Sequence, residues 1–479
     1  MDITDQQSKG WLIGILAGGK STRMNSDIPK VLHPIAGKPM VAHVLQSIRT
    51  ATKANVSVVV PPNSKSIREQ LDQNVSFVEQ AIPLGTGDAV RQLQGISNKE
   101  NLSILIAYGD TPLIKPGTIS RLIAKHESSN ATVTLLTSIS SSPNDYGKII
   151  RNASGKIVKL TEYSDLEESQ LHNSEVNTGL YAFNGKWLWA TLGQLKPSEK
   201  GEYYLTDLIE KAASSEMAIE SITTENEIEG IGVNNRIDLA KVEQIMRRNI
   251  LNGWMTEGVT IIDPSATYID AEVKIGKDTT IHPNTSILGQ SAVGQGCSVG
   301  PNTVIRNSII HDRVEVIASI IDRSTLYPDV TVGPFSHLRP NTVIGNHSNI
   351  GNFAEIKNSM VGAYTAIGHF GYIGDSTIGN GVNIGAGTVT ANFNGQTKSR
   401  TNIEDDAFIG SDTILIAPVN IGKRAYTAAG SVITKNVPTD NLAIGIPAKM
   451  EPMSEPKKKS WQIKLAKKKS CAKSKLGEA

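Results

Sequence analysis

Short apolar runs alternate with amphipathic stretches along the first half of the chain. Four runs predict buried strands: Trp11–Ala17, Val56–Val60, Leu102–Ala107 and Thr132–Thr137. The stretches between them carry apolar residues at helical spacing and predict helices: Pro39–Ala51, Asp88–Gly95 and Pro116–Glu127. Strands that alternate with helices favour a mostly parallel sheet in a Rossmann-like α/β domain, in which ligands bind beyond the carboxyl ends of the strands.

The pattern changes after residue 234. Residues 235–252 keep apolar side chains at helical spacing, and Gly253 follows as a helix stop. We therefore predict a connecting helix at 235–253.

Beyond Ile261, aliphatic residues recur at every sixth position. The series runs unbroken, returns after an irregular patch and then resumes once more: Ile275, Ile281, Ile287, Val293, Val299 and Ile305; Val332, Leu338, Ile344, Ile350 and Ile356; Ile403, Ile409, Leu415 and Ile421. A hexapeptide repeat of this kind is typical of a parallel β-helix with one inward aliphatic residue per face. The neighbouring Gly, Asn and Asp residues suit its tight corners. Because each coil exposes flat strands, and such prisms commonly pack side by side, we expect a homotrimer.

Composition narrows the class of protein. A chain of 479 residues suggests two or three domains. Its two cysteines, Cys297 and Cys471, argue against a disulfide framework and favour a reducing compartment. The start, "MDITDQQSKG", lacks the basic-then-apolar pattern of a signal peptide, and no apolar run approaches the roughly 20 residues that span a bilayer. We expect a cytoplasmic protein with no membrane insertion.

The net charge of +2 hides a basic tail. From Pro456 onward there are nine lysines and one acidic residue, so the rest of the chain carries −6. The tail, residues 454–479, reads as a disordered, solvated extension; binding to nucleic acid or anionic lipid is the alternative. Because the rest of the chain has no basic excess, we expect no nucleic-acid partner.

Two motifs follow two of the predicted strands. "LAGGKSTRM" (Leu16–Met24) offers glycine N–H groups to an anion, and Lys20, Arg23 and Lys30 add positive charge. It is neither a Walker A loop nor a G-x-G-x-x-G fingerprint, which disfavours a generic ATPase or dehydrogenase. In "AYGDTPL", Asp110 can hold Mg²⁺ against a polyphosphate, although a turn cap is the ordinary role of such a residue. Together the two motifs fit one nucleotide site.

The ordered motifs "LAGGKSTRM", "PKVLH", "EQ…LGTGDA", "YGDTPL", "EVNTGLYAF" and "GVNNR" resemble those of sugar-phosphate nucleotidyltransferases. With the hexapeptide repeat, the chain from about residue 11 to 450 resembles the bifunctional N-acetylglucosamine-1-phosphate uridyltransferase/glucosamine-1-phosphate N-acetyltransferases. The resemblance implies a nucleotidyltransferase domain followed by a left-handed parallel β-helix. It also implies that the chain makes UDP-N-acetylglucosamine, a precursor of peptidoglycan and lipopolysaccharide, from UTP, glucosamine 1-phosphate and acetyl-CoA.

The resemblance assigns roles in the first half. Arg23 and Lys30 would neutralise the triphosphate during attack by the sugar phosphate, and Asp110 and Asn234 would bind Mg²⁺. The UTP and UDP-sugar contacts would be Leu16, Ala17, Gly18, Gly19, Lys30, Gln80, Gly85, Thr86, Tyr108, Gly109, Asp110, Gly147, Glu162, Asn177 and Asn234. The turn here reads Gly18-Gly19-Lys20-Ser21, where the family more often has Ala-Gly-Lys-Gly.

In the second half, the repeat breaks fully at 391–401, and such loops often carry function. His369, in "GHFGYIGD", stands near a slip in the repeat. From the residues alone it could be scaffold, metal ligand or catalyst, although no H-x₄-H pair supports a metal; a neutral imidazole suits a base near pH 7.

The resemblance selects His369 as the base that deprotonates the substrate amine. It places Arg339, Lys357, Tyr372 and Asn383 on glucosamine 1-phosphate. It places the following on acetyl-CoA: Ala386, Asn392, Phe393, Lys398, Ser411, Ala429 and Lys449. Phe393 stands where the family often has tyrosine, and Lys449 is the candidate for a place that arginine takes in some members.

We therefore predict a uridyltransferase domain at 1–234, a linker helix at 235–253, an acetyltransferase β-helix at 254–453 and a Lys-rich tail at 454–479. One alternative is a single-activity nucleotidyltransferase for another sugar, with a β-helix that only assembles it. The other is a non-enzymatic scaffold. The first alternative is disfavoured by the joint presence of His369, Lys357, Tyr372 and Asn383. The second is disfavoured by the charged residues of the first half.

Overall fold

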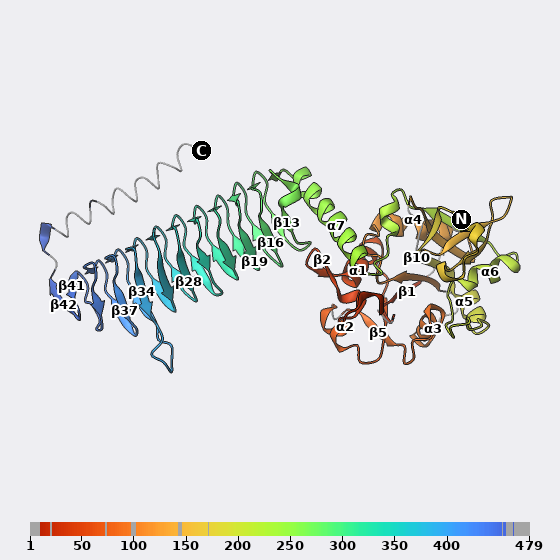
Figure 1. Cartoon of the computed structure of the whole chain (residues 1–479), viewed down its shortest axis with the longest axis horizontal. Coiled ribbons are helices and arrows are strands. Elements are labelled where there is room, and N and C mark those ends of the chain that lie inside the picture. Colours follow the sequence, from red (N-terminus) through yellow and green to blue (C-terminus); the bar gives the residue numbers. More distant parts are fainter. Residues whose placement is uncertain are drawn as a thin grey trace, which may run out of the picture. The chain divides into compact units, whose positions relative to one another are not determined.

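The computed structural model describes residues 10–19, 22–71, 74–96, 102–141, 146–170, 172–452, 454–456 and 463. The predictions made for Lys20 and Ser21, and for most of the Lys-rich tail, lie outside these residues. The chain forms two compact units, Met1–Met246 and Arg247–Ala479 (Figure 1). No helix in the described part of the chain is both long and apolar enough to cross a membrane.

The first unit is built on a nine-stranded sheet. Its main path runs β11-β7-β10-β6-β1-β4-β5, and β8 and β9 attach through β10. The strands are β1 Trp11–Leu16, β4 Val56–Val60, β5 Ser76–Glu79, β6 Ser103–Tyr108, β7 Val133–Ile139, β8 Lys148–Arg151, β9 Ile157–Thr161, β10 Glu175–Asn184 and β11 Ile219–Thr223. Only β10 runs antiparallel to its neighbours on that path, so the sheet is mostly parallel, as predicted.

Helices cover both faces of this sheet. They are α1 Met40–Ala51, α2 Lys65–Gln70, α3 Thr86–Arg91, α4 Pro116–Ser129, α5 Gly185–Leu192 and α6 Asp207–Ser214. Strand side chains point alternately to the two faces. Ile13 and Ile15 of β1 therefore join one apolar core with α1, α2 and α4, whereas Leu12 joins the other with α3, α5 and α6.

The helix predicted at Asp88–Gly95 differs from the observed one. The α-helix α3 starts at Thr86 and gives way to a 3₁₀ turn, η3, at Gln92–Ile96. Gly85, at φ +101°, turns the chain into α3, and an added Cβ there would lie 2.6 Å from the Tyr203 carbonyl oxygen. This close approach of two backbones requires glycine.

The connecting helix α7 spans Arg236–Thr256, so Gly253 does not end it. Trp254 and Met255 pack against the aliphatic core of the second unit, and this contact carries the helix past the glycine. The helix is followed by Gly258, at φ +90°.

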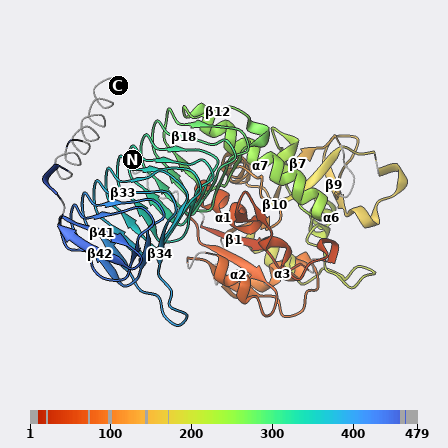
Figure 2. The same ribbon diagram turned by 60° about the vertical axis from the view of Figure 1, so that its left-hand side comes forward.

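The second unit is a stack of coils whose short parallel strands form three sheets (Figures 1 and 2). The 12-stranded sheet contains β12 Thr260–Ile261, β15 Thr280–Ile281, β18 Ser298–Val299, β21 Glu315–Val316, β24 Thr331–Val332, β27 Asn349–Ile350, β30 Ala366–Ile367, β33 Asn383–Ile384, β36 Phe408–Ile409, β39 Tyr426–Thr427, β41 Asn441–Gly445 and β42 Ala448–Pro452. The last pair, β41 and β42, is an antiparallel hairpin.

The other two sheets follow the same order of coils. The 10-stranded sheet contains β13 Tyr268–Ile269, β16 Ser286–Leu288, β19 Val304–Arg306, β22 Ile320–Asp322, β25 His337–Leu338, β28 Ala354–Lys357, β31 Gly371–Gly374, β34 Thr388–Ala391, β37 Ile414–Ile416 and β40 Val432–Ile433. The nine-stranded sheet contains β14 Lys274–Ile275, β17 Ala292–Val293, β20 Ile309–Ile310, β23 Ser324–Leu326, β26 Thr342–Ile344, β29 Met360–Val361, β32 Ser376–Ile378, β35 Thr401–Ile403 and β38 Val419–Ile421.

The patch that appeared irregular in the sequence is part of the same stack. Ile310, Val316, Ile321 and Leu326 are all buried in the continuous aliphatic core. Three of the steps from Ile305 to Leu326 are five residues instead of six, because the corners there are one residue shorter. The real interruption is the loop between β34 and β35, which projects from the stack beside β34 (Figure 1).

Candidate active sites

A cavity of about 470 Å³ opens beyond the carboxyl ends of β1, β4 and β6. It brings together fifteen of the sixteen residues proposed for the nucleotide reaction: Leu16, Ala17, Gly18, Gly19, Arg23, Lys30, Gln80, Gly85, Thr86, Tyr108, Asp110, Gly147, Glu162, Asn177 and Asn234. Gly109 is not on the cavity wall; its N–H donates to the Leu16 carbonyl (3.0 Å) and joins the ends of β6 and β1. The position beyond the strand ends is the usual ligand site of such sheets.

Four charged or polar groups form the centre of this cavity. The Lys30 ammonium donates to Asp110 Oδ2 (2.5 Å) and to Asn234 Oδ1 (3.1 Å). The Arg23 guanidinium also donates to Asn234 Oδ1 (3.1 Å). The Val233 N–H donates to the Asp110 carbonyl (2.9 Å), which ties the two segments together. Oxygen ligands and cations therefore converge on one point.

The donor set at this point fits Mg²⁺. Mg²⁺ is usually bound through one or two carboxylates plus substrate phosphates, and it keeps several waters. Asp110 supplies a carboxylate and Asn234 an amide oxygen, and both already accept hydrogen bonds from one cationic group, the Lys30 ammonium. The residues present could hold the ion that the sequence predicted.

Gln80 links two loops at the cavity wall. Its buried amide donates to the Gly85 carbonyl (3.1 Å) and to Asp88 Oδ2 (2.8 Å). Its oxygen faces Gly18, where an added Cβ would lie 3.0 Å away. The amide thus links the glycine turn after β1 to the start of α3.

Another part of the cavity wall is formed by residues of β8, β9 and β10 or next to them. Gly147 precedes β8, Glu162 follows β9 and Asn177 lies in β10, where its N–H donates to the Gly147 carbonyl (2.9 Å). Burial raises the pKa of Glu162, and the hydrogen bond from the Thr206 hydroxyl (2.9 Å) opposes that rise. A carboxylate and an amide beside a glycine can bind sugar hydroxyl and amide groups.

The sequence reasoning missed part of this wall. Tyr146, Glu202 and Tyr204 also line the cavity. Glu202 and Tyr204 lie in an irregular segment between α5 and α6, which reaches the site because the Tyr203 N–H donates to the Leu84 carbonyl (2.7 Å). The tyrosine pair in "GEYYLTD" was the only local signal.

In the second unit, His369 lies at a corner between β30 and β31 and is exposed. The same corner recurs in the next coils at Ala386, Ser411 and Ala429, which backbone hydrogen bonds connect. The bonds are Gly387 N–H to Phe370 (2.8 Å), Asp412 N–H to Ala386 (2.6 Å) and Gly430 N–H to Ser411 (2.8 Å). Three residues proposed for acetyl-CoA thus form one column that starts at His369.

Three basic side chains lie near the carboxyl end of β28. Arg339 donates to Glu355 (2.6 Å), and Lys357 lies beside Lys398. The close approach of Lys398, and then the charge of Arg339, lowers the pKa of Lys357. The structure thus places Lys398, proposed for acetyl-CoA, with the residues proposed for the sugar phosphate. Three cations at one edge suit a phosphate.

Asn392, proposed for acetyl-CoA, is held by a residue that the sequence did not single out. Its amide donates to the buried Asp375 carboxylate (2.5 Å) and to the Tyr372 hydroxyl (3.5 Å). The Asn358 amide donates to the other Asp375 oxygen (2.5 Å). Asp375 therefore orients Asn392 next to Tyr372.

The remaining three predicted residues lie in different parts of the second unit. Asn383 is in the 12-stranded sheet, on another face from Tyr372. Phe393 is exposed in the projecting loop, where it bridges to Lys398. Lys449 is in β42, opposite Ile444 of β41.

Comparison with known proteins finds a family match in each half of the chain. The nucleotidyl transferase family model matches residues 14–255, and the bacterial transferase hexapeptide model matches 272–307 and 328–358. A bifunctional GlmU protein from Exiguobacterium sibiricum is 43% identical over 431 residues, covering 90% of this chain and 96% of the relative. Those from Carboxydothermus hydrogenoformans (45%, 90% and 96%) and Limosilactobacillus reuteri (42%, 93% and 98%) are similar over as much of their length.

Proposed function

The chain belongs to the family of bifunctional GlmU proteins, the acetyltransferase and uridyltransferase enzymes of UDP-N-acetylglucosamine synthesis, and we propose that its two units divide these activities. The β-helix unit transfers acetyl from acetyl-CoA to glucosamine 1-phosphate. The first unit then joins N-acetylglucosamine 1-phosphate to UTP and releases pyrophosphate.

The convergence of Lys30, Arg23, Asp110 and Asn234 in one cavity carries the proposal for the first unit. The sugar phosphate oxygen attacks the α-phosphorus of UTP, and the bond to the pyrophosphate oxygen breaks. Such a transfer depends mainly on positioning and charge neutralisation. Arg23 and Lys30 supply positive charge, and Gly147, Glu162 and Asn177 hold the sugar.

Asp110 and Asn234 would hold Mg²⁺, which when bound neutralises the phosphate oxygens. The hydrogen bonds of Lys30 to Asp110 and Asn234 place its positive charge beside both residues that would hold the ion.

In the second unit, glucosamine 1-phosphate lies along the outer face of β28 and β31. Its phosphate faces Arg339, Lys357 and Lys398, and its amine faces the corner that carries His369. The imidazole takes a proton from the amine, the amine nitrogen forms a bond to the acetyl carbon, and the thiolate of CoA leaves. The corner column at Ala386, Ser411 and Ala429, with Asn392, receives acetyl-CoA.

We further propose that the enzyme is a cytoplasmic homotrimer. Exposed aromatic side chains on successive corners, Phe335, Phe353 and Phe370, give the prism an apolar edge that a second copy would cover. Sedimentation equilibrium of the full chain tests this, and a monomer at working concentrations would contradict it.

One assay tests both reactions. Purified protein is supplied with UTP, glucosamine 1-phosphate, acetyl-CoA and Mg²⁺, and each component is omitted in turn. Free CoA should appear without UTP or Mg²⁺, whereas pyrophosphate should require all four components. Pyrophosphate release without acetyl-CoA would instead support a single-activity nucleotidyltransferase for an unacetylated sugar.

A further inference from the structure

The hairpin formed by β8 and β9 carries two of the residues proposed for the sugar. Gly147 lies just before β8 and Glu162 just after β9. The hairpin has little backbone attachment to the rest of the sheet, because β8 pairs with β10 at a single position, Val176 with Lys148. Ile149, Ile157 and Leu160 anchor the hairpin in the apolar core, and directional polar contacts set its position along the sheet.

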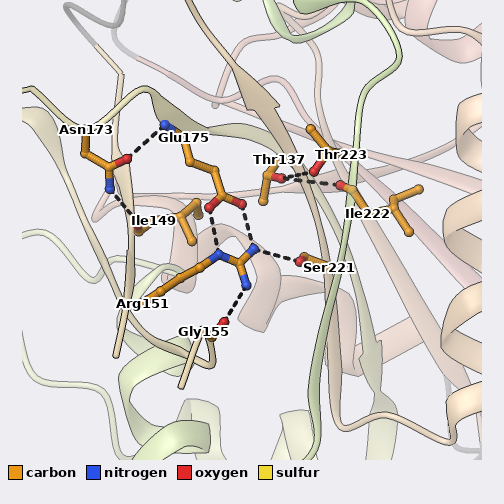
Figure 3. Close-up of polar contacts among 9 residues, drawn as sticks. All are labelled: Thr137, Ile149, Arg151, Gly155, Asn173, Glu175, Ser221, Ile222 and Thr223. Carbon is orange, nitrogen blue, oxygen red and sulfur yellow. Dashed lines mark hydrogen bonds and ion pairs between the residues drawn. The ribbon is translucent and has the colours of Figure 1, made fainter. Parts of the chain in front are cut away.

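Arg151, at the end of β8, holds the β8–β9 hairpin in place through its guanidinium group (Figure 3). Its Nε and Nη2 donate to the two carboxylate oxygens of Glu175 in β10, at 2.7 Å each. Nη1 donates to the Gly155 carbonyl in the hairpin turn (3.0 Å), and Nη2 also donates to the Ser221 hydroxyl in β11 (3.0 Å). A paired fork of this kind is directional as well as strong.

Asn173 adds a second tie beside the first (Figure 3). Its amide donates to the Ile149 carbonyl in β8 (2.6 Å), and its oxygen accepts from the Glu175 N–H (2.9 Å). The Glu175 carboxylate is 13% exposed. Burial alone would raise its pKa, but the hydrogen bonds from Arg151 and Thr137 bring the pKa below its ordinary value. The pair is therefore ionised at neutral pH.

Neither residue lines the cavity. Glu175 is, however, two residues from Asn177, whose N–H donates to the Gly147 carbonyl (2.9 Å). We propose that Arg151 and Glu175 are a positioning pair that sets the sugar subsite, and so selects for the sugar phosphate without affecting the nucleotide. This inference rests on the proposed uridyltransferase function.

The experiment compares Arg151→Met with Arg121→Met in the full chain. Arg121 also forms an ion pair, with Glu225 at 2.7 Å, in the same unit but off the cavity wall. Arg151→Met should raise KM for N-acetylglucosamine 1-phosphate about tenfold, since small displacements of positioning groups are costly. KM for UTP and kcat should not change, which is the pattern of binding energy lost equally from the ground state and the transition state. Arg121→Met should leave all three unchanged.

Three further experiments separate positioning from stability. Glu175→Gln keeps the shape of the side chain and should show the same selective rise in KM. Calorimetry with UDP-N-acetylglucosamine should show weaker binding by both variants, while UTP binds as in the unaltered protein. Arg151→Lys keeps the charge but not the fork, so it should restore only part of the affinity.

The proposal is overturned if Arg151→Met behaves like Arg121→Met, or if both KM values rise together with a lower melting temperature while Glu175→Gln is normal. Failure of the proposed function is a different result, because unaltered protein would then release no pyrophosphate from UTP and N-acetylglucosamine 1-phosphate.

Discussion

In the first unit, segments more than 200 residues apart in sequence meet at one cavity: Lys30 contacts Asn234, and each side chain there has its own set of partners. In the β-helix unit, the same corner and the same buried aliphatic position recur in coil after coil, and the candidate site follows from that repetition. His369, Ala386 and Ser411 are brought into line by the scaffold itself.

The difference lies in what each unit depends on. The β-helix core is a continuous column of aliphatic side chains, so its stability is spread over many similar contacts between neighbouring coils. The first unit also has apolar cores on both faces of its sheet, but its cavity residues are placed by single polar contacts, such as the Val233–Asp110 bond and the Arg151 fork. Each variant below should therefore affect one unit and spare the other.

The largest effect should come from His369→Ala. If the imidazole is the acetyl-transfer base, acetyl transfer should fall about 10²- to 10⁴-fold, the range of a positioned proton transfer. Uridylyl transfer to supplied N-acetylglucosamine 1-phosphate should be unchanged. CoA release and pyrophosphate release, measured on the same preparation, test both statements.

His347→Ala is the matched control for that variant. His347 stacks on Tyr364 and lies 3.7 Å from Asp329, which marks it as a scaffold histidine. His347→Ala should lower the melting temperature of the β-helix unit and leave the rate of acetyl transfer nearly unchanged. Full acetylation by a folded His369→Ala protein would eliminate the base assignment.

Asp110→Ala gives the reverse pattern. Loss of the only carboxylate among the four converging groups should reduce uridylyl transfer about 10²- to 10³-fold, because a metal contributes several kcal/mol of charge stabilisation. Acetyl transfer should continue. Pyrophosphate release is measured across a Mg²⁺ titration, and a normal rate at saturating Mg²⁺ would contradict the ligand assignment.

Sequence patterns predicted the elements whose residues repeat at a fixed spacing or form a continuous apolar run. Strands such as Val56–Val60 and the aliphatic positions of the β-helix are recognisable because burial alone requires their side chains. The β8–β9 hairpin was not predicted, since Lys148 and Arg151 interrupt its apolar pattern and it is fixed by the distant Glu175 and Ser221. The end of α7 was misplaced because Trp254 packs on a core that local propensity does not register.

The candidate sites show the same division. Arg23, Lys30 and Asp110 stand in compact motifs and could be found from them and the resemblance. Glu202 and Tyr204 reach the cavity through a contact between segments more than 100 residues apart, for which no local pattern exists. Asp375 acts through Asn358 and Asn392, and a single aspartate in a repeat gives no sign of such a role.

A core variant tests how widely β-helix stability is spread. Ile350→Ala, in a central coil, should cost about 3 kcal/mol of unfolding free energy, as for other buried large-to-small changes. Ile275→Ala, near the first coil and 8% exposed, should cost less, because it has fewer neighbouring coils. Calorimetry of the full chain should show the change only in the β-helix transition. Equal costs at the two positions would contradict the nearest-neighbour view.

The smallest effect concerns the pH dependence of the first unit. Burial raises the pKa of Glu175, but the hydrogen bonds from Arg151 and Thr137 and the charge of Arg151 together lower it below its ordinary value. Its contribution to stability is therefore present above the unfolded value, roughly pH 4.3, and is lost as pH falls through the folded pKa. With Arg151 34% exposed, this contribution should be about 1 kcal/mol.

The contribution of Glu162 to stability depends on pH in the opposite direction. Burial raises the pKa of Glu162, so its contribution is lost as pH rises. The pH profile of the free energy of unfolding therefore combines the contributions of Glu162 and Glu175. The difference in this free energy between the unaltered protein and Glu175→Gln isolates the contribution of Glu175. In urea unfolding followed by tryptophan fluorescence, the gap should be about 1 kcal/mol at pH 7 and should close as pH falls below the pKa. A gap that stays constant would mean that Glu175 stabilises the hairpin by packing, and the charge-based fork would lose its support.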